Sequence, residues 1–307
     1  MIEACDLSRY YGSTLAVDGV SFQVDAGEVV GLLGPNGAGK TTAMKMLTGY
    51  LEPSSGHVRL DGQDMATHRR VLQRRIGYLP ENCPIYPDMT VVDYLDYQAV
   101  LHGVADSERP AAVRSAIRRA ALDAHALSPV SQLSRGYRQR TGVAQAILYQ
   151  PDVVILDEPT NGLDPEQIRE MRSLIRSLAE HAAVLVSTHI LQEVQAVCDR
   201  VLMMRQGRLA LDARLDELGG SQRLLLSVDA GLEDLRGIVG DLSAIEDIDE
   251  LPAEGAARRY ALNTHKDASA LAPELARRLH EAGLSLYALT PVKRDLETVF
   301  AEVNSDN

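Results

Sequence analysis

The sequence has few cysteines, and no two of them lie near each other. Cys5, Cys83 and Cys198 are too scattered to form a disulfide framework or to supply a zinc site. No apolar run approaches the roughly 18 residues that a membrane-spanning helix requires. The first residues, which include Glu3 and Asp6, lack the apolar segment of a secretion signal. These absences predict a protein of the reducing cytoplasm.

Positive charge and aromatic side chains are also scarce. The 307 residues include 31 Lys and Arg against 43 Asp and Glu, so the formal net charge is -12, and only 4% of the residues are aromatic, with no Trp. A nucleic-acid-binding surface needs cations that displace counterions, and single-strand binding needs rings on which bases stack. We therefore expect no nucleic-acid partner.

The chain has the pattern of two domains. Short apolar runs at 153–156 and 183–187 alternate with helical segments, which is typical of an α/β fold with a mostly parallel sheet. Residues about 82–150 hold no convincing strand and predict an inserted helical subdomain. We expect a first domain over residues 1–218 and a second over 221–307.

The second domain shows a strand, a helix, two strands, a helix and a strand in that order. This order predicts a small α+β domain of ferredoxin-like topology. Beyond it, Leu296, Val299, Phe300 and Val303 recur at helical spacing and predict one apolar helix face. The pattern fits packing on its own domain more readily than docking on a partner.

A glycine-rich segment, Gly-Pro-Asn-Gly-Ala-Gly-Lys-Thr-Thr at 34–42, lies between a predicted strand and a predicted helix and fits G-x-x-x-x-G-K-[ST]. Its glycines let backbone N–H groups form a cup for phosphate oxygens, and the helix start adds positive partial charge. Lys40 supplies a full charge to the β- and γ-phosphates, and the Thr41 hydroxyl is a ligand for Mg²⁺. The residues that we expect to bind the nucleotide here are Asn36, Gly37, Ala38, Gly39, Lys40, Thr41 and Thr42.

Two carboxylates end the apolar run at 153–156. We expect Asp157 to lie beside Mg²⁺ and Glu158 to orient or deprotonate the attacking water. Two buried carboxylates without a cation are costly, so the pair itself points to a bound metal. His189 follows the run at 183–187 and is expected at the same sheet edge, where it would contact the γ-phosphate or the catalytic water.

A second anion site is predicted where Ser134 and Gly136 directly precede a helix. One triphosphate rarely needs two such sites. A dimer in which each chain's second site covers the other chain's nucleotide uses both.

These motifs resemble those of the ABC-transporter ATPases. Residues 133–140, Leu-Ser-Arg-Gly-Tyr-Arg-Gln-Arg, are similar to the family's signature motif, and 34–42 and 153–158 to its Walker A and Walker B elements. The resemblance covers about residues 1–215, with all motifs in family order. It implies a P-loop NTPase fold of the ABC type.

The resemblance also implies roles for further residues. Residues 161–164 look like the family's D-loop, which places Asp164 near the nucleotide, and His189 matches its switch histidine. Tyr11 matches the aromatic residue that stacks on adenine, although an ordinary strand tyrosine is the alternative.

Two positions depart from the family pattern. The signature commonly has Gly and Gln where this chain has Arg135 and Tyr137, and the Q-loop usually has Gln where this chain has Glu81. A carboxylate at that position still serves as an Mg²⁺ ligand near the nucleotide. As an anion beside a triphosphate, it is expected to change metal affinity and pH dependence.

Residues 78–82 and 87–91, with a domain after residue 220, resemble one exporter-type branch that includes drug and polysaccharide exporters and gliding-motility-associated subunits. The resemblance implies an ATPase that binds ATP and Mg²⁺, forms a head-to-tail homodimer, and receives a helix of separate permease subunits at about 82–105. We expect a cytoplasmic location, peripheral on the inner face of the cell membrane.

Two other functions remain open at this point. A soluble ABC ATPase that acts on ribosomes or DNA usually has two ATPase units or long coiled coils, and this chain shows neither. A nucleotide sensor without turnover is disfavoured because Glu158 and His189 are both present, whereas Glu81 keeps it open.

Overall fold

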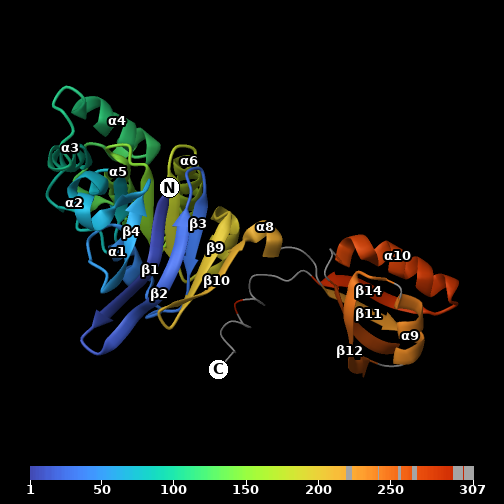
Figure 1. The fold of residues 1–307 in the computed structure, drawn as a ribbon. Helices are drawn as coiled ribbons and strands as arrows, with labels where there is room; N and C mark the ends of the chain where they lie inside the picture. The colour runs from blue at the N-terminus through green and yellow to red at the C-terminus, as the bar shows by residue number, and fades with distance from the viewer. Residues whose placement is uncertain (219–222, 241, 255–256, 265–267, 293–299, 301–307) are drawn as a thin grey trace. The chain divides into compact units, whose positions relative to one another are not determined.

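The computed structural model describes residues 1–218, 223–240, 242–254, 257–264, 268–292 and 300. The chain divides into two compact units, Met1–Arg214 and Leu215–Asn307 (Figure 1). Among the described residues, every helix is too short or too polar to cross a membrane.

A six-stranded sheet in the order β10-β9-β3-β8-β7-β6 forms the centre of the first unit. Neighbouring strands run parallel, except that β10 is antiparallel to β9. Strands β3, β7 and β8 are buried over their whole length, as expected for continuous apolar runs in a parallel sheet covered on both faces. The strands are β3 (Val29–Leu33), β6 (Ile76–Leu79), β7 (Val153–Asp157), β8 (Ala183–Thr188), β9 (Arg200–Arg205) and β10 (Arg208–Arg214).

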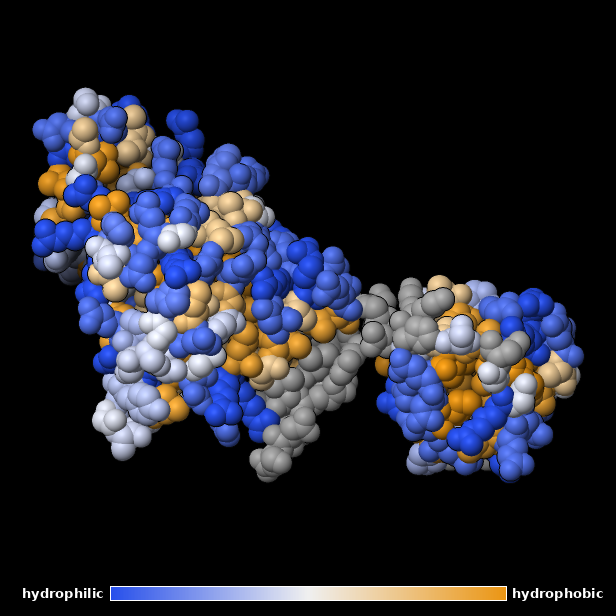
Figure 2. Space-filling model, in the orientation of Figure 1, coloured by the Kyte–Doolittle hydropathy of each residue, from blue (hydrophilic) through white to orange (hydrophobic). Residues whose placement is uncertain are grey.

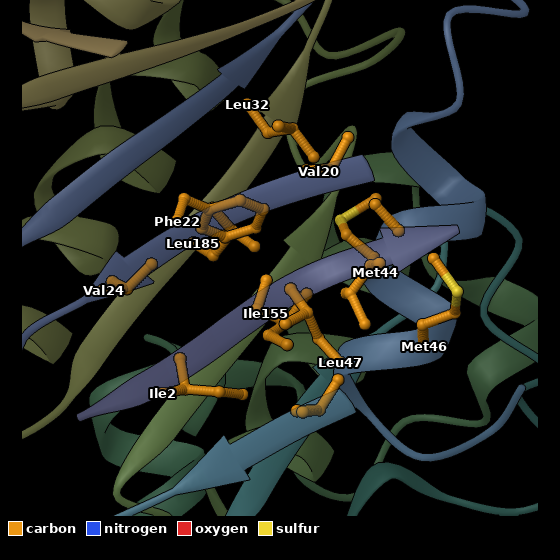
Figure 3. Packing of buried hydrophobic residues seen from close by; sticks show 14 of the residues in the cluster. Ile2, Val20, Phe22, Val24, Leu32, Met44, Met46, Leu47, Ile155 and Leu185 are labelled. Carbon is orange, nitrogen blue, oxygen red and sulfur yellow. The ribbon is translucent and has the colours of Figure 1, made fainter. Parts of the chain in front are cut away.

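An antiparallel sheet in the order β2-β1-β4-β5 packs on the six-stranded sheet. Its strands are β1 (Ile2–Tyr11), β2 (Thr14–Val24), β4 (Ser55–Leu60) and β5 (Gln63–Asp64). The core of the unit lies between the two sheets. There, side chains from β1 and β2 meet those of β3, β7 and β8, and helix α1 (Lys40–Leu47) contributes Met44, Met46 and Leu47 (Figure 3).

Residues 82–150, all of which the structure describes, contain helices α3, α4 and α5 and a single β-bridge in place of a strand. These three helices gather at one end of the first unit (Figure 1). Side-chain caps begin several helices of the unit, because Asp64, Thr90, Ser134 and Asp164 accept hydrogen bonds from first-turn N–H groups. The helices are α2 (Met65–Gln73), α3 (Val91–Leu101), α4 (Arg109–Arg119), α5 (Arg135–Ile147), α6 (Pro165–Ala179) and α7 (Leu191–Val197), with 3₁₀ turns at Asp123–His125 and Val130–Gln132.

The second unit contains an antiparallel sheet in the order β12-β13-β11-β14. Leu224, Leu226 and Val228 of β11 are buried with α9 and α10, whereas Leu225 points to the opposite face. Figure 2 shows hydrophobic residues gathered in the middle of the visible face of this unit, with hydrophilic residues around them. The elements are α8 (Leu215–Leu218), β11 (Arg223–Val228), α9 (Leu232–Val239), β12 (Ile245–Glu254), β13 (Ala257–Thr264), α10 (Ala268–Glu281) and β14 (Leu286–Val292).

Two details of the second unit bear on the sequence predictions. Residues 215–218, which the sequence assigns to the first domain, form α8 and group with the second unit. The predicted apolar helix face at 296–303 lies outside the described residues, apart from Phe300.

Two glycines give a test of this packing. A Cβ on Gly77 of β6 would lie 2.1 Å from the Ala146 carbonyl oxygen, whereas a Cβ on Gly237 of α9 meets nothing within 4 Å. We expect Gly77→Ala to lower the free energy of unfolding of the first unit by about 1–3 kcal/mol through overpacking. Gly237→Ala should instead stabilise the second unit by up to about 1 kcal/mol, because alanine is the better helix former. Urea unfolding of both variants measures this, and equal effects of the same sign would contradict the packing of β6 on α5.

Candidate nucleotide site

A cavity of about 360 Å³ opens where β3, β7 and β8 end and the loops that follow them meet. This is the sheet edge at which α/β folds bind ligands. The cavity collects most of the residues that the sequence predicts for nucleotide binding and chemistry. Its lining residues are Ala16, Asn36, Gly37, Ala38, Gly39, Lys40, Thr41, Thr42, Glu81, Asp157, Glu158, Asn161 and His189.

The loop between β3 and α1 depends on glycine at two positions. A Cβ on Gly34 would lie 2.4 Å from the Met204 carbonyl oxygen, and a Cβ on Gly39 would lie 2.6 Å from that of Ala16. Gly39 also has a φ of +102°, which side chains disfavour, at the N-cap of α1. The N-terminus of α1 therefore has free N–H groups and positive partial charge directed at the cavity.

Lys40 is only 7% exposed, and its ammonium donates to the carbonyl oxygens of Gly34 at 2.7 Å and Pro35 at 3.3 Å. Burial lowers the pKa of Lys40, while the nearby carboxylates of Glu158, Asp157 and Glu81 oppose that shift. Because its hydrogen-bond partners are neutral carbonyl groups, the ammonium is held in place with its charge available to an anion.

Thr41 and Asp157 bring two oxygens together from different elements. The Thr41 hydroxyl at the start of α1 donates to Asp157 Oδ2 at 3.1 Å, at the end of β7. Asp157 is 1% exposed, and burial raises its pKa although the Thr41 hydrogen bond favours its charged form. A buried carboxylate of this kind is stabilised by a cation.

The pair fits Mg²⁺, which needs only one or two protein oxygens because it keeps several waters and takes others from phosphates. In the part of the chain that the structure describes, no three His, Cys, Asp or Glu side chains come together as an all-protein metal cage. The residues present therefore suit a metal that arrives with a nucleotide.

Glu158 and His189 form a hydrogen-bonded pair in the cavity. His189 Nδ1 lies 3.0 Å from both carboxylate oxygens of Glu158. Because a carboxylate only accepts, Nδ1 carries the proton of this hydrogen bond, which leaves Nε2 available to a ligand or water. Glu158 is 7% exposed and has a φ of +50°, a strained value for a side-chain-bearing residue. Such strain is typical of functional positions.

Four predicted residues do not line the cavity. Tyr11 is exposed at the β1–β2 turn, with the Arg9 guanidinium 5.2 Å from its ring centre. Ser134 and Gly136 lie at the start of α5, and Asp164 caps α6 by accepting from two N–H groups. Within one chain, the structure does not bring these residues to the nucleotide.

Two lining residues, Ala16 and Asn161, were not among the predicted site residues. Asn161 follows Glu158 by three positions, so its place in the loop after the paired carboxylates was a usable signal. Ala16 carries no chemistry of its own, and nothing in its local sequence indicates that β2 passes beside the cavity.

Known proteins share both the sequence and the fold. The family model for the ABC transporter matches residues 17–161. The chain is 32% identical over 302 residues to an uncharacterized ABC transporter ATP-binding protein, YdbJ of Bacillus subtilis, covering 97% of this chain and 94% of that protein. It is 36% identical to the bacitracin transport ATP-binding protein BcrA of Bacillus licheniformis, over 74% of each chain.

Among solved structures, cbiO1 from Clostridium perfringens, described as part of the ABC transporter complex cbiONQ, matches with a TM-score of 0.65 and 28% identity. The match covers 78% of this chain and 95% of that one. The likeness to YdbJ extends over almost the whole of both chains, and the cavity brings Lys40 of the glycine-rich loop together with Asp157 and Glu158. The chain therefore belongs to the ABC transporter family, as an ATP-binding subunit that hydrolyses ATP.

Proposed function

We propose that this chain is the motor subunit of an exporter, bound to separate permease subunits at the inner face of the cell membrane and working as a head-to-tail homodimer. One observation carries the proposal: Lys40 and three carboxylates line one cavity, whereas Ser134 and the start of α5 lie outside it. Another relative, 37% identical over 233 residues, is named a Nod factor export ATP-binding protein, which favours export as the direction.

The dimer follows from the residues outside the cavity. Ser134 starts a 13-residue helix, α5, and is exposed, so its hydroxyl and the helix N-terminus are open to an external anion. Gly136 and Asp164 lie beside it. In the proposed dimer these residues cover the nucleotide of the other chain, and Tyr11 stacks on the adenine held in its own chain.

The cavity residues divide the work of hydrolysis. Lys40 and the N–H groups at the start of α1 bind phosphate oxygens and stabilise the charge that develops on them. Glu158 orients the attacking water and accepts its proton, and His189 holds the Glu158 carboxylate in position through Nδ1. Thr41, Asp157 and Glu81 are the proposed ligands of Mg²⁺, which supplies positive charge to the phosphates when bound.

A groove of about 590 Å³ is the proposed permease dock. Its lining includes Lys45, Arg70 and Arg74 and no Asp or Glu, and none of these three cations has an ion pair in the described part of the chain. The hydroxyl of Tyr78, also in the groove, is buried without a hydrogen-bond partner among the described residues. The groove therefore fits a short permease helix that carries carboxylates.

The groove extends the predicted dock. The sequence assigns permease contact to about 82–105, whereas the structure adds residues of α1, α2 and α5 to the lining. For the second unit, we propose a ferredoxin-like fold, because its order of elements and its strand order β12-β13-β11-β14 have that topology.

Glu158→Gln tests the motor and the dimer together. Since an amide cannot accept the proton of the attacking water, turnover should fall by about 100-fold or more while ATP still binds. Trapped ATP should then hold two copies together, which size-exclusion chromatography in Mg·ATP measures. Glu180→Gln, an exposed carboxylate at the end of α6, is the control and should keep parental turnover. A Glu158→Gln protein that stays monomeric at saturating Mg·ATP would refute the dimer.

Glu81→Gln tests the unusual carboxylate. The Glu81 charge raises the pKa of Asp157, so its removal lowers that pKa and keeps Asp157 ionised at lower pH. The acid limb of the ATPase pH profile should therefore move to lower pH, with turnover retained. ATPase rates measured at fixed Mg²⁺ between about pH 5 and pH 8 would show this shift of the acid limb. A profile identical to that of the parent and of Glu180→Gln would remove any electrostatic role for Glu81.

Charge reversal in the groove tests the dock. Arg70→Glu with Arg74→Glu should reduce permease-stimulated ATPase activity by about tenfold or more, because like charges would then face each other. Basal activity should not change, since neither residue lines the nucleotide cavity. The assay uses vesicles with the membrane protein encoded by the neighbouring gene. Arg69→Glu, on the same helix but paired with Glu52 outside the groove, is the matched control. Equal stimulation of both variants would contradict the dock.

A further inference from the structure

Arg135 stands where the signature motif commonly has glycine, and its side chain lies against a loop of the same chain. A Cβ on Gly162 would lie 2.5 Å from Arg135 Cζ and 2.6 Å from Nη1. Gly162 also has a φ of +72°, in the left-handed region that favours glycine. The guanidinium thus occupies the space that a side chain at residue 162 would need.

Arg135 and Gly162 are both exposed, so this contact lies at the surface of the chain. Arg135 has no hydrogen bond or ion pair within the described ranges, and the loop residue beneath it has no side chain to pair with. A planar guanidinium can lie flat on a glycine backbone, which a branched or bulkier loop residue would prevent.

Two neighbouring contacts join the same pair of segments. A Cβ on Gly136 would lie 2.3 Å from Gln167 Oε1, so α5 and α6 approach closely there. One turn further on, the buried Arg140 pairs with Glu170 of α6. Side chains therefore join α5 to α6 at two points, Gly136 with Gln167 and Arg140 with Glu170, and Arg135 adds a contact to the loop that precedes α6.

The loop under Arg135 leads directly from the reactive carboxylate. The Asn161 N–H donates to the Glu158 carbonyl at 3.1 Å, and the Leu163 N–H donates to that of Thr160 at 3.2 Å. Asn161 lines the cavity, and Asp164 at the end of the loop caps α6. A restraint on Gly162 therefore acts at the middle of the short connection between the cavity and α6.

We propose that Arg135 is a positioning residue that holds the 161–164 loop against the start of α5. As a result, Ser134 and Asp164 present one rigid surface to the nucleotide of the other chain. The loop restraint concerns a single chain, whereas its consequence for the other chain's nucleotide rests on the dimer of the proposed function.

Hydrogen exchange of the nucleotide-free full chain tests the restraint. Arg135→Ala should speed amide exchange within 158–164 by about tenfold, because the loop loses its cover. Arg135→Met keeps a long packing side chain without the charge and should stay near the parent. Arg138→Ala, an exposed arginine one turn along α5, is the matched control and should not change the exchange. Exchange in Arg135→Ala no faster than in Arg138→Ala overturns the proposal, and so does exchange in Arg135→Met as fast as in Arg135→Ala.

The dimer dissociation constant tests the proposed effect of Arg135 on the nucleotide of the other chain. In the Glu158→Gln background, Arg135→Ala should raise the dimer dissociation constant in Mg·ATP by about tenfold, with the ATP affinity of dilute monomer unchanged. Sedimentation and a fluorescent-nucleotide titration measure the two. If the background protein dimerises and Arg135→Ala leaves that constant unchanged, the link to the other chain is refuted. If the background protein itself never dimerises, the proposed function fails, and hydrogen exchange still decides the role of Arg135.

Discussion

Opposite charges buried in one small cavity are the constraint on which the rest of this structure depends. Lys40, Asp157 and Glu158 are all less than a tenth exposed. Burial lowers the pKa of Lys40 and raises the pKa of Asp157, because it favours the neutral form of each group. Each buried ion costs several kcal/mol unless it is compensated. Lys40 is the one Lys or Arg among the described lining residues, against three carboxylates. A metal-bound triphosphate suits this balance, because it brings a cation for the carboxylates and oxygens for Lys40.

The ends of parallel strands bring the charged residues of the cavity together. β3, β7 and β8 end side by side, so the residues after each strand converge although they are far apart in sequence. Positive φ angles at two residues then set the geometry of the loops that follow these strands. Gly39 allows the turn into α1, and Glu158 keeps a strained φ of +50° at the turn out of β7. The Glu158 N–H donates to the Ser187 carbonyl at 3.0 Å, which ties the strained residue to the neighbouring strand. The sheet thereby compensates for strain at Glu158, the residue proposed to activate the water.

Much of this was predictable because the motifs are local and the hydrophobic runs are strong. The helical subdomain predicted over about 82–150 contains helices α3, α4 and α5, and the apolar runs at 153–156 and 183–187 lie in β7 and β8. Strand β10 was not predicted, because none of its residues is fully buried and the strand depends on pairing with β9. In the site, the contact of Arg135 with Gly162 could not be predicted, because neither residue's neighbours in sequence show that the two segments pack together.

The segment after β6 connects the nucleotide cavity with the proposed permease groove. Glu81 lines the nucleotide cavity, whereas Pro80 and Asn82 on either side of it line the cationic groove. Because the three residues are consecutive in the chain, a displacement of Glu81 moves residues that contact the groove. The segment is also held to α5, since Cys83 Sγ lies 3.6 Å from Gln145 Oε1 and a Cβ on Gly142 would meet Cys83 Sγ at 3.0 Å. Because Ser134 caps α5, one helix joins the groove to the surface proposed to cover the nucleotide of the other chain. Occupation of the nucleotide cavity and occupation of the groove therefore act on the same short stretch of chain.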